Sequence, residues 1–128
     1  MSAGLQELAY QQLTPLMEEW VGQPLERSWG YGVRSYGSGS RLHMHRDLVD
    51  SHVVSCIVHV ADQSNQPWPL DFIDHDAERH RVSFKPGTML FYESLAPMGA
   101  LLHSMETSIA TCIFTGALKP GTPRLTSR

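Results

Sequence analysis

Two side chains that can bind a metal ion lie two residues apart in this sequence. His45-Arg46-Asp47 offers an imidazole and a carboxylate. On a β-strand residues i and i+2 share one face, so both side chains can reach one ion while Arg46 points away. With a second imidazole they would cover one face of an octahedral ion and leave its other positions open, as in non-haem Fe(II) centres. No cysteine adjoins the pair, which argues against a structural zinc site.

The pair by itself is a weak signal, because a chain with seven histidines produces His-x-Asp readily by chance. The alternative interpretation is a loop histidine that is hydrogen-bonded to a nearby carboxylate. A second group of potential ligands comprises Asp74, His75, Asp76 and His80. Its polar, turn-prone context favours a solvated hairpin tip over a metal site.

The composition describes one ordinary domain. The chain has 128 residues, of which 41% are hydrophobic and 18% charged, enough for a core and too little charge for disorder. The net charge of -3, with 10 Lys and Arg residues spread along the chain, argues against a nucleic-acid or anionic-membrane surface. No apolar run approaches the roughly 18 residues of a transmembrane segment. The lack of a signal-peptide pattern favours the cytoplasm. Cys56 and Cys112 are expected to be buried thiols.

The apolar pattern predicts one N-terminal helical segment followed by many short strands. Apolar residues from Leu5 to Trp20 follow helical spacing and predict a core-facing stripe. Pro15 allows either one kinked helix or two short ones. Strands are expected at 29–33, 52–60, 70–73, 81–84 and 89–92, separated by Gly/Pro turns. This order favours a β-sandwich or barrel with a helix packed outside.

Several separated motifs in the right order resemble the prolyl 4-hydroxylase-like branch of the 2-oxoglutarate/Fe(II) dioxygenases. They lie between Leu16 and Ser94, about two-thirds of the chain. The matching stretches are Leu16–Trp20, Tyr31–Tyr36, Gly39–Asp47, His52–Ser55, Trp68–Leu70 and Pro86–Ser94. Such an ordered set is far more specific than His-x-Asp alone.

The resemblance implies a mainly β fold, a double-stranded β-helix or jelly roll with the N-terminal helix packed outside. It also implies that His45 and Asp47 are the first two Fe(II) ligands. Tyr36 falls near the cosubstrate pocket, and a role as a packed strand aromatic is equally consistent with its position. The cofactors implied are Fe(II), 2-oxoglutarate as cosubstrate, and ascorbate. The partners implied are O2 and a prolyl residue of a peptide or protein.

The remaining histidines do not match ligand positions of the family. His43 is interpreted as a pocket-lining or surface residue, and His52 as a structural hydrogen-bonding residue. His59, amid valines, is interpreted as a core histidine.

The C-terminal part departs from the family pattern. The third iron-ligating histidine, followed by Gly-Arg, would fall where the chain reads Met98-Gly99-Ala100, and His103 lies several residues late. No basic residue follows until Lys119, so the residue that pairs with the distal carboxylate of 2-oxoglutarate is not identifiable there. A one-base slip in the coding sequence just before Met98 would account for this, since the shifted codons can read His-Gly-Arg. We therefore divide the chain into an incomplete dioxygenase-like domain, 1–97, and an aberrant C-terminal tail, 98–128.

Two functions follow as hypotheses. The first is an Fe(II)- and 2-oxoglutarate-dependent dioxygenase that hydroxylates prolyl residues. The alternative is a catalytically degraded jelly-roll binding module that lacks the third iron ligand. A zinc-type hydrolase or a cupin isomerase is less consistent with the sequence, because no general base or thiolate accompanies the motif.

Overall fold

The computed structural model describes residues 1–30, 32–37, 39–47, 53–63, 69–83, 85–93, 96–101 and 109–121. In this part of the chain one helix is followed by nine strands. The helix is α1 (Ala3–Val21), and the strands are β1 (Leu25–Gly30), β2 (Arg34–Tyr36), β3 (Arg41–His45), β4 (Val54–Asp62), β5 (Leu70–Ile73), β6 (Arg79–Val82), β7 (Met89–Glu93), β8 (Met98–Leu101) and β9 (Ile109–Leu118). No described helix has the length and apolar character that crossing a membrane requires.

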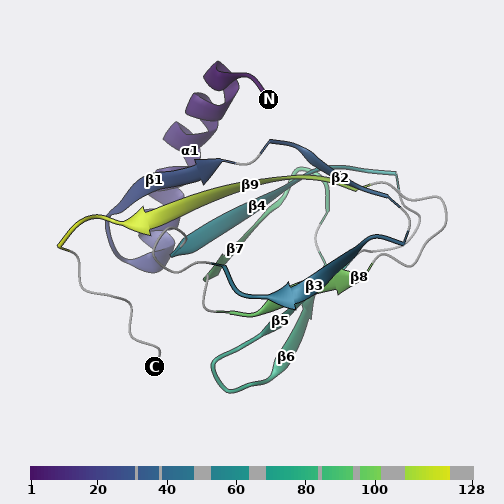
Figure 1. Ribbon diagram of the computed structural model, residues 1–128. Helices are drawn as coiled ribbons and strands as arrows, with labels where there is room; N and C mark the ends of the chain where they lie inside the picture. The colour runs from purple at the N-terminus through teal and green to yellow at the C-terminus, as the bar shows by residue number, and fades with distance from the viewer. Residues whose placement is uncertain are drawn as a thin grey trace.

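The strands form two antiparallel sheets, and α1 packs on the larger one (Figure 1). The larger sheet has the order β1-β9-β4-β7, with β2 also paired to β9. The smaller sheet has the order β3-β8-β5-β6. This arrangement is a jelly roll with an N-terminal helix outside it, as the sequence predicts.

Helix α1 is a single helix of 19 residues with Pro15 inside it, so the alternative of two short helices is wrong. It begins at Ser2, whose side chain accepts a hydrogen bond from the Leu5 N–H, and it ends at Gly22 in the left-handed conformation, with φ of 74°. Leu13 and Met17 of the predicted stripe are buried, whereas Leu5, Leu8, Leu16 and Trp20 are exposed. Among the described residues, α1 contacts strands of the larger sheet, and a single flat contact buries a narrower face than the apolar stripe.

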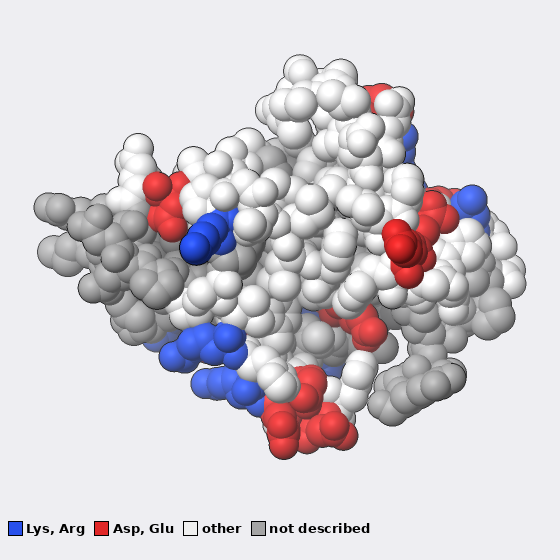
Figure 2. All heavy atoms as spheres, turned by 180° about the vertical axis from the view of Figure 1, so that it is seen from behind, with Lys and Arg blue, Asp and Glu red and all other residues white. Residues whose placement is uncertain are grey.

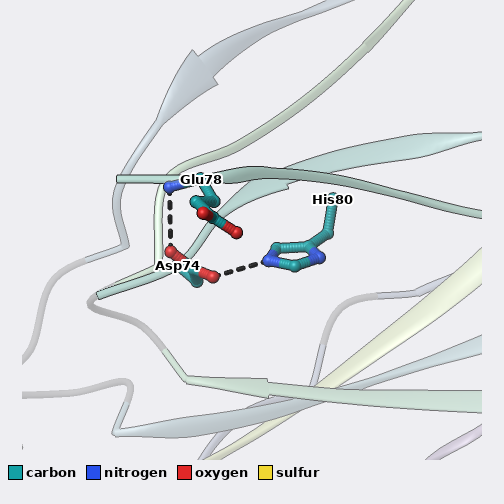
Figure 3. Close-up of side chains that lie close together, drawn as sticks. All are labelled: Asp74, Glu78 and His80. Atoms are coloured by element: carbon teal, nitrogen blue, oxygen red, sulfur yellow. Dashed lines mark hydrogen bonds and ion pairs between the residues drawn. The ribbon is translucent and has the colours of Figure 1, made fainter. Parts of the chain in front are cut away.

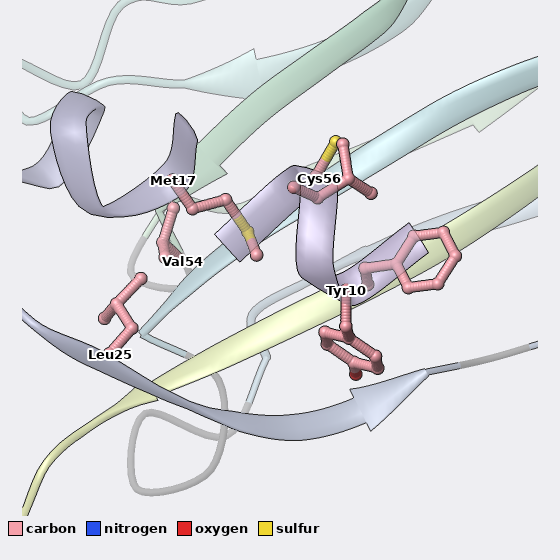
Figure 4. Close-up of a cluster of buried hydrophobic side chains, with 7 residues drawn as sticks. Tyr10, Met17, Leu25, Val54 and Cys56 are labelled. Carbon is pink, nitrogen blue, oxygen red and sulfur yellow. The ribbon is translucent and has the colours of Figure 1, made fainter. Parts of the chain in front are cut away.

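Two separate hydrophobic clusters explain why β4 is buried along both faces. Alternate side chains of a strand point to opposite sides. Val54 and Cys56 therefore face α1 and pack with Met17 and Phe114 (Figure 4), while Ile57 faces the smaller sheet. The inter-sheet cluster consists of Ile57, Leu70, Phe72, Tyr92 and Met98. Burial raises the pKa of the Cys56 thiol to about 12, as expected for a buried structural thiol.

Strands β8 and β9 come from the segment beyond residue 97. Strand β9 lies inside the larger sheet, hydrogen-bonded to β1, β2 and β4, and Phe114 to Ala117 are buried in it. Pairing within a sheet does not distinguish between reading frames of the coding DNA. The division at residue 97 therefore stays a prediction.

Candidate metal and ligand pocket

A pocket of about 100 Å³ lies between the two sheets and contains the predicted His-x-Asp pair. Its lining consists of Arg34, Tyr36, Leu42, His45, Asp47, Tyr92, Met98, Ile113 and Thr115. The residues come from β2, β3, β7, β8 and β9, with Asp47 from the segment after β3. All three site residues that the sequence predicts, Tyr36, His45 and Asp47, thus line one pocket.

His45 and Asp47 converge in this pocket. The Nε2 atom of His45 lies 3.5 Å from Oδ1 of Asp47. Two ligand atoms, each about 2.1 Å from one ion, are roughly 3.0 Å apart at a right angle and roughly 3.4 Å apart at a tetrahedral angle. The two side chains are therefore nearly at the separation that one shared metal ion requires. Their exposed fractions, 40% for His45 and 20% for Asp47, leave both open to an ion.

The other polar atoms of the pair, Nδ1 of His45 and Oδ2 of Asp47, have hydrogen-bond partners. The Nδ1 atom of His45 lies 2.7 Å from the backbone carbonyl of His43. A carbonyl can only accept, so Nδ1 carries the proton and Nε2 of the neutral ring keeps its lone pair for a metal. The Tyr92 hydroxyl donates to Oδ2 of Asp47 at 3.0 Å, which leaves Oδ1 facing His45. Supporting contacts of this kind orient metal ligands in proteins.

A β-bulge sets the direction of His45. The register of β3 against β8 passes from Leu42 opposite Ala100 to His45 opposite Met98, so β3 contains one extra residue here. The bulge lets Leu42 and His45, an odd number of residues apart, both line the pocket. Sequence alternation alone does not reveal this. Strand β3 also ends at His45, so Asp47 reaches the pocket from just beyond the strand rather than from within it.

Gly99 allows the close approach of β8 to this bulge. A Cβ atom at Gly99 would lie 2.9 Å from the Leu42 carbonyl oxygen and 3.0 Å from the Met44 nitrogen. These atoms are backbone, so a side chain could be accommodated only if β3 moved away. Glycine at this position therefore maintains the geometry that presents His45.

Met98 occupies the position opposite His45. Its side chain is 3% exposed, belongs to the inter-sheet cluster and lines the pocket. It stands where the family pattern would have its third ligand, and a thioether is a poor ligand for a hard divalent ion. His103 lies outside the described residues. The described residues of this pocket therefore supply two ligands of the kind that Fe(II) prefers, His45 and Asp47.

A buried hydroxyl lies between two residues that line the pocket. Ser55 is fully buried between Tyr92 on β7 and Thr115 on β9, its register partners. Residues directly opposite one another in an antiparallel sheet share a face, so Ser55 is on the pocket side. Its Oγ atom has no hydrogen-bond partner among the described residues.

The remaining histidines have other surroundings. His43 is exposed, and its described role is the carbonyl that orients His45. His59 is 4% exposed, with Nε2 3.8 Å from Oδ2 of Asp62, which agrees with a core histidine. The prediction for His52 falls outside the described residues.

A second group that could hold a metal ion lies at the β5–β6 hairpin (Figure 3). One ligand atom from each of Asp74, Glu78 and His80 lies within 4.8 Å of the other two. Oδ1 of Asp74, however, accepts hydrogen bonds from the Asp76 and Glu78 N–H groups, and Oδ2 lies 2.6 Å from His80 Nε2. The His80 hydrogen bond, followed by the loop amides, lowers the pKa of Asp74. The group thus has the contacts of a hairpin turn, as the sequence favours. Acidic side chains gather at this end of the molecule (Figure 2).

Comparisons with known proteins agree on the fold. No family model matches the chain, and no curated protein is similar to it in sequence. Among solved structures, the chain is similar to a prolyl-4-hydroxylase from Pseudomonas putida, with a TM-score of 0.67 and 17% identity over 85% of this chain and 63% of that one. It is also similar to AviO1 from Streptomyces viridochromogenes Tue57, with a TM-score of 0.73 and 16% identity over 97% of this chain and 65% of that one. A cupin domain from Bordetella pertussis Tohama I gives 0.50 at 11% identity, over 71% of this chain and 82% of that one.

These similarities show a cupin- or dioxygenase-like fold. The chain spans less than two-thirds of the length of the first two structures. Identities this low carry the fold and not the activity. The function must therefore be argued from the pocket.

Proposed function

We propose that this chain binds a divalent metal ion, Fe(II), through His45 and Asp47 and acts as a 2-oxoglutarate-dependent dioxygenase. The observation that carries the proposal is the convergence of His45 Nε2 and Asp47 Oδ1, 3.5 Å apart, in a pocket between the two sheets. An imidazole and a carboxylate suit Fe(II), and both residues line the pocket, so they would hold the ion there. The fold and the family resemblance of the motifs support the same assignment.

The proposed reaction converts a substrate C–H bond, O2 and 2-oxoglutarate into C–OH, succinate and CO2. Bound Fe(II) with 2-oxoglutarate would supply the oxidising chemistry, and ascorbate would return oxidised iron to Fe(II). The substrate that we propose is a prolyl residue of a peptide or protein. This choice rests on the resemblance and on the similarity of the fold to a prolyl-4-hydroxylase.

Residues next to His45 and Asp47 would fix the orientation of these two ligands. The His43 carbonyl fixes the tautomer of His45, and the Tyr92 hydroxyl fixes the rotation of the Asp47 carboxylate. The side chains of Leu42, Met98 and Ile113 form apolar parts of the wall. Low local polarity strengthens the interactions of the polar groups that remain.

Succinate formation tests the proposal. The purified chain is incubated with Fe(II), 2-oxoglutarate, ascorbate and proline-rich peptides, and succinate is measured. We expect Fe(II)-dependent succinate that Asp47→Ala abolishes and that the matched hairpin variant Asp74→Ala leaves unchanged. Equal succinate from the parent chain and Asp47→Ala would reject catalysis by this chain.

One observation favours the second candidate, a binding module derived from such an enzyme. Met98 lies opposite His45 where a third ligand would complete the site. A variant Met98→His offers an imidazole at that position. If the chain is a degraded module, Met98→His should raise Fe(II) affinity about tenfold or more and the parent chain should form no succinate. If another residue already completes the site, Met98→His should not raise the affinity.

A further inference from the structure

The pocket has a second end, away from His45 and Asp47. Arg34 and Tyr36 lie two residues apart on β2, share one face of the larger sheet and both line the pocket. Among the described residues that line the pocket, Arg34 is the one permanently charged cation. It is accessible to solvent, so a ligand that enters from outside can reach it. The ring of Tyr36 also packs against the inter-sheet cluster, which fixes the wall beside Arg34.

The strand register separates the two ends. Tyr92, which holds Asp47, lies opposite Ser55, and Ser55 lies opposite Thr115 on β9. Arg34 of β2 lies opposite Thr111, which is also on β9. Four residues of β-strand cover roughly 13 Å between the Cα atoms. An extended arginine side chain spans about half of this distance, which leaves the length of a short carbon chain between the guanidinium and the metal ligands.

The wall between the two ends is apolar. Leu42 of β3 and Ile113 of β9 line the pocket, and Ile113 lies between Thr111 and Thr115 along β9. The described part of β9 contributes Ile113 and Thr115 to the lining, and neither is a cation. A ligand that fills the pocket would thus have a metal-binding end, an apolar middle and an anionic end.

We propose that Arg34 binds the distal carboxylate of a small dicarboxylate whose other end reaches the metal at His45 and Asp47. This inference rests on the proposed function, and it assigns the carboxylate-pairing role to β2 rather than to the C-terminal strand. A guanidinium presents two parallel N–H donors that match the two oxygens of a carboxylate. The Tyr36 hydroxyl is a further donor on the same wall. The short carbon chain of the ligand packs between Leu42 and Ile113.

Paired ligands that differ only at the distal group test this assignment. The chain is loaded with Mn(II), which does not support turnover, and binding of 2-oxoglutarate and of 2-oxopentanoate is measured by calorimetry. The second compound has a methyl group in place of the distal carboxylate. We expect the parent chain to prefer 2-oxoglutarate by about 10-fold or more, since hydrogen bonds to charged groups are the stronger ones.

The Arg34→Gln variant should lose this preference through weaker binding of 2-oxoglutarate, with affinity for 2-oxopentanoate unchanged. The Arg34→Lys variant should keep part of the preference, because it keeps the charge and loses the paired geometry. The matched control is Arg41→Gln, since Arg41 is exposed on β3 and does not line the pocket; the preference should persist there.

The outcomes separate the two proposals. A parent chain that binds neither Mn(II) nor either acid overturns the proposed function and this inference with it. A parent chain that prefers 2-oxoglutarate while Arg34→Gln and Arg34→Lys keep the full preference overturns the inference alone. If Arg34→Gln does not fold, Arg34→Lys decides: an undiminished preference contradicts the role of Arg34 as the paired guanidinium.

Discussion

Two regions of this molecule bring histidine and carboxylate side chains together, and they differ in which atoms remain available. At the β5–β6 hairpin, both oxygens of Asp74 already have partners, from the loop amides and from His80. In the pocket, Tyr92 binds only Oδ2 of Asp47, and the His43 carbonyl binds only Nδ1 of His45. The pocket pair thus keeps one ligand atom each directed toward the same space. Ligand residues that lie close together therefore indicate a metal site only where their ligand atoms remain available to an ion.

The largest expected effect is a loss of metal affinity when Asp47 is replaced, with the equivalent change at Asp74 of the hairpin as the control. The Asp47→Ala variant should lose metal affinity by at least about 100-fold, more than the loss typical of supporting residues. The Asp74→Ala variant should change affinity by less than about twofold, because the Asp74 oxygens are engaged within the hairpin. Calorimetry with Mn(II) or Co(II) on both variants provides the measurement. A larger loss in Asp74→Ala would reverse the assignment.

Removal of the contact that supports Asp47 should have the next largest effect. The Tyr92→Phe variant keeps the ring packed against Phe72 and loses the hydroxyl that holds Oδ2. We expect a fall in metal affinity of about 10- to 100-fold. The control is Tyr10→Phe, another buried tyrosine, on α1 in the other cluster. Unchanged affinity in Tyr92→Phe would show that Asp47 is oriented by other contacts.

The buried hydroxyl of Ser55 is expected to give a smaller effect, on stability and not on binding. The Ser55→Ala variant removes a buried hydroxyl without a partner among the described residues. The free energy of unfolding should stay the same or rise by up to about 1 kcal/mol, since an unsatisfied buried polar group is costly. The affinity for 2-oxoglutarate with Mn(II) should stay the same, because Ser55 is fully buried and does not line the pocket. Chemical denaturation and calorimetry measure the two quantities, and a loss of stability would indicate a structural hydrogen bond.

The hairpin is expected to give the smallest effect, a change in stability that is confined to acid pH. The His80 hydrogen bond and the loop amides hold the pKa of Asp74 below its usual value. A carboxyl with a lowered folded pKa adds stability above its unfolded pKa of about 3.9 and loses it as the pH falls through the folded value. The Asp74→Asn variant should therefore show a flatter acid limb of stability than the parent chain below about pH 4. Identical limbs in denaturation between pH 2 and 6 would contradict this.

Strand alternation and turn residues are local signals, so the sequence predicted a β-sandwich or barrel with a helix outside it, and the family resemblance implied the jelly roll. The strands at 70–73 and around 89–92 lie where the pattern predicted them. The His-x-Asp spacing also predicted that the side chains of His45 and Asp47 would meet. The prediction assumed that both residues lie on one regular strand, whereas β3 contains a bulge and ends at His45. The bulge and the fit of Gly99 against the Leu42 carbonyl depend on the neighbouring strand. No pattern within β3 encodes them.

The partners of the site come from distant parts of the chain, which explains why they could not be predicted. Tyr92 is 45 residues from Asp47, and Arg34 reaches the pocket through the pairing of β2 with β9. The family pattern places the cation near the C-terminus, whereas the sequence signals of Arg34 are its i, i+2 relation to Tyr36 and its place in the matching stretch 31–36. The predicted apolar stripe of α1 is wider than its buried face, because hydrophobic spacing does not indicate how many sides of a helix other elements cover.

The most direct test of the pocket as the metal site is an anomalous-scattering map of crystals soaked in Mn(II). We predict one peak within about 2.0–2.4 Å of both His45 Nε2 and Asp47 Oδ1, the range of metal–nitrogen and metal–oxygen bonds. A peak at Asp74 and His80 with none between His45 and Asp47 would contradict the account.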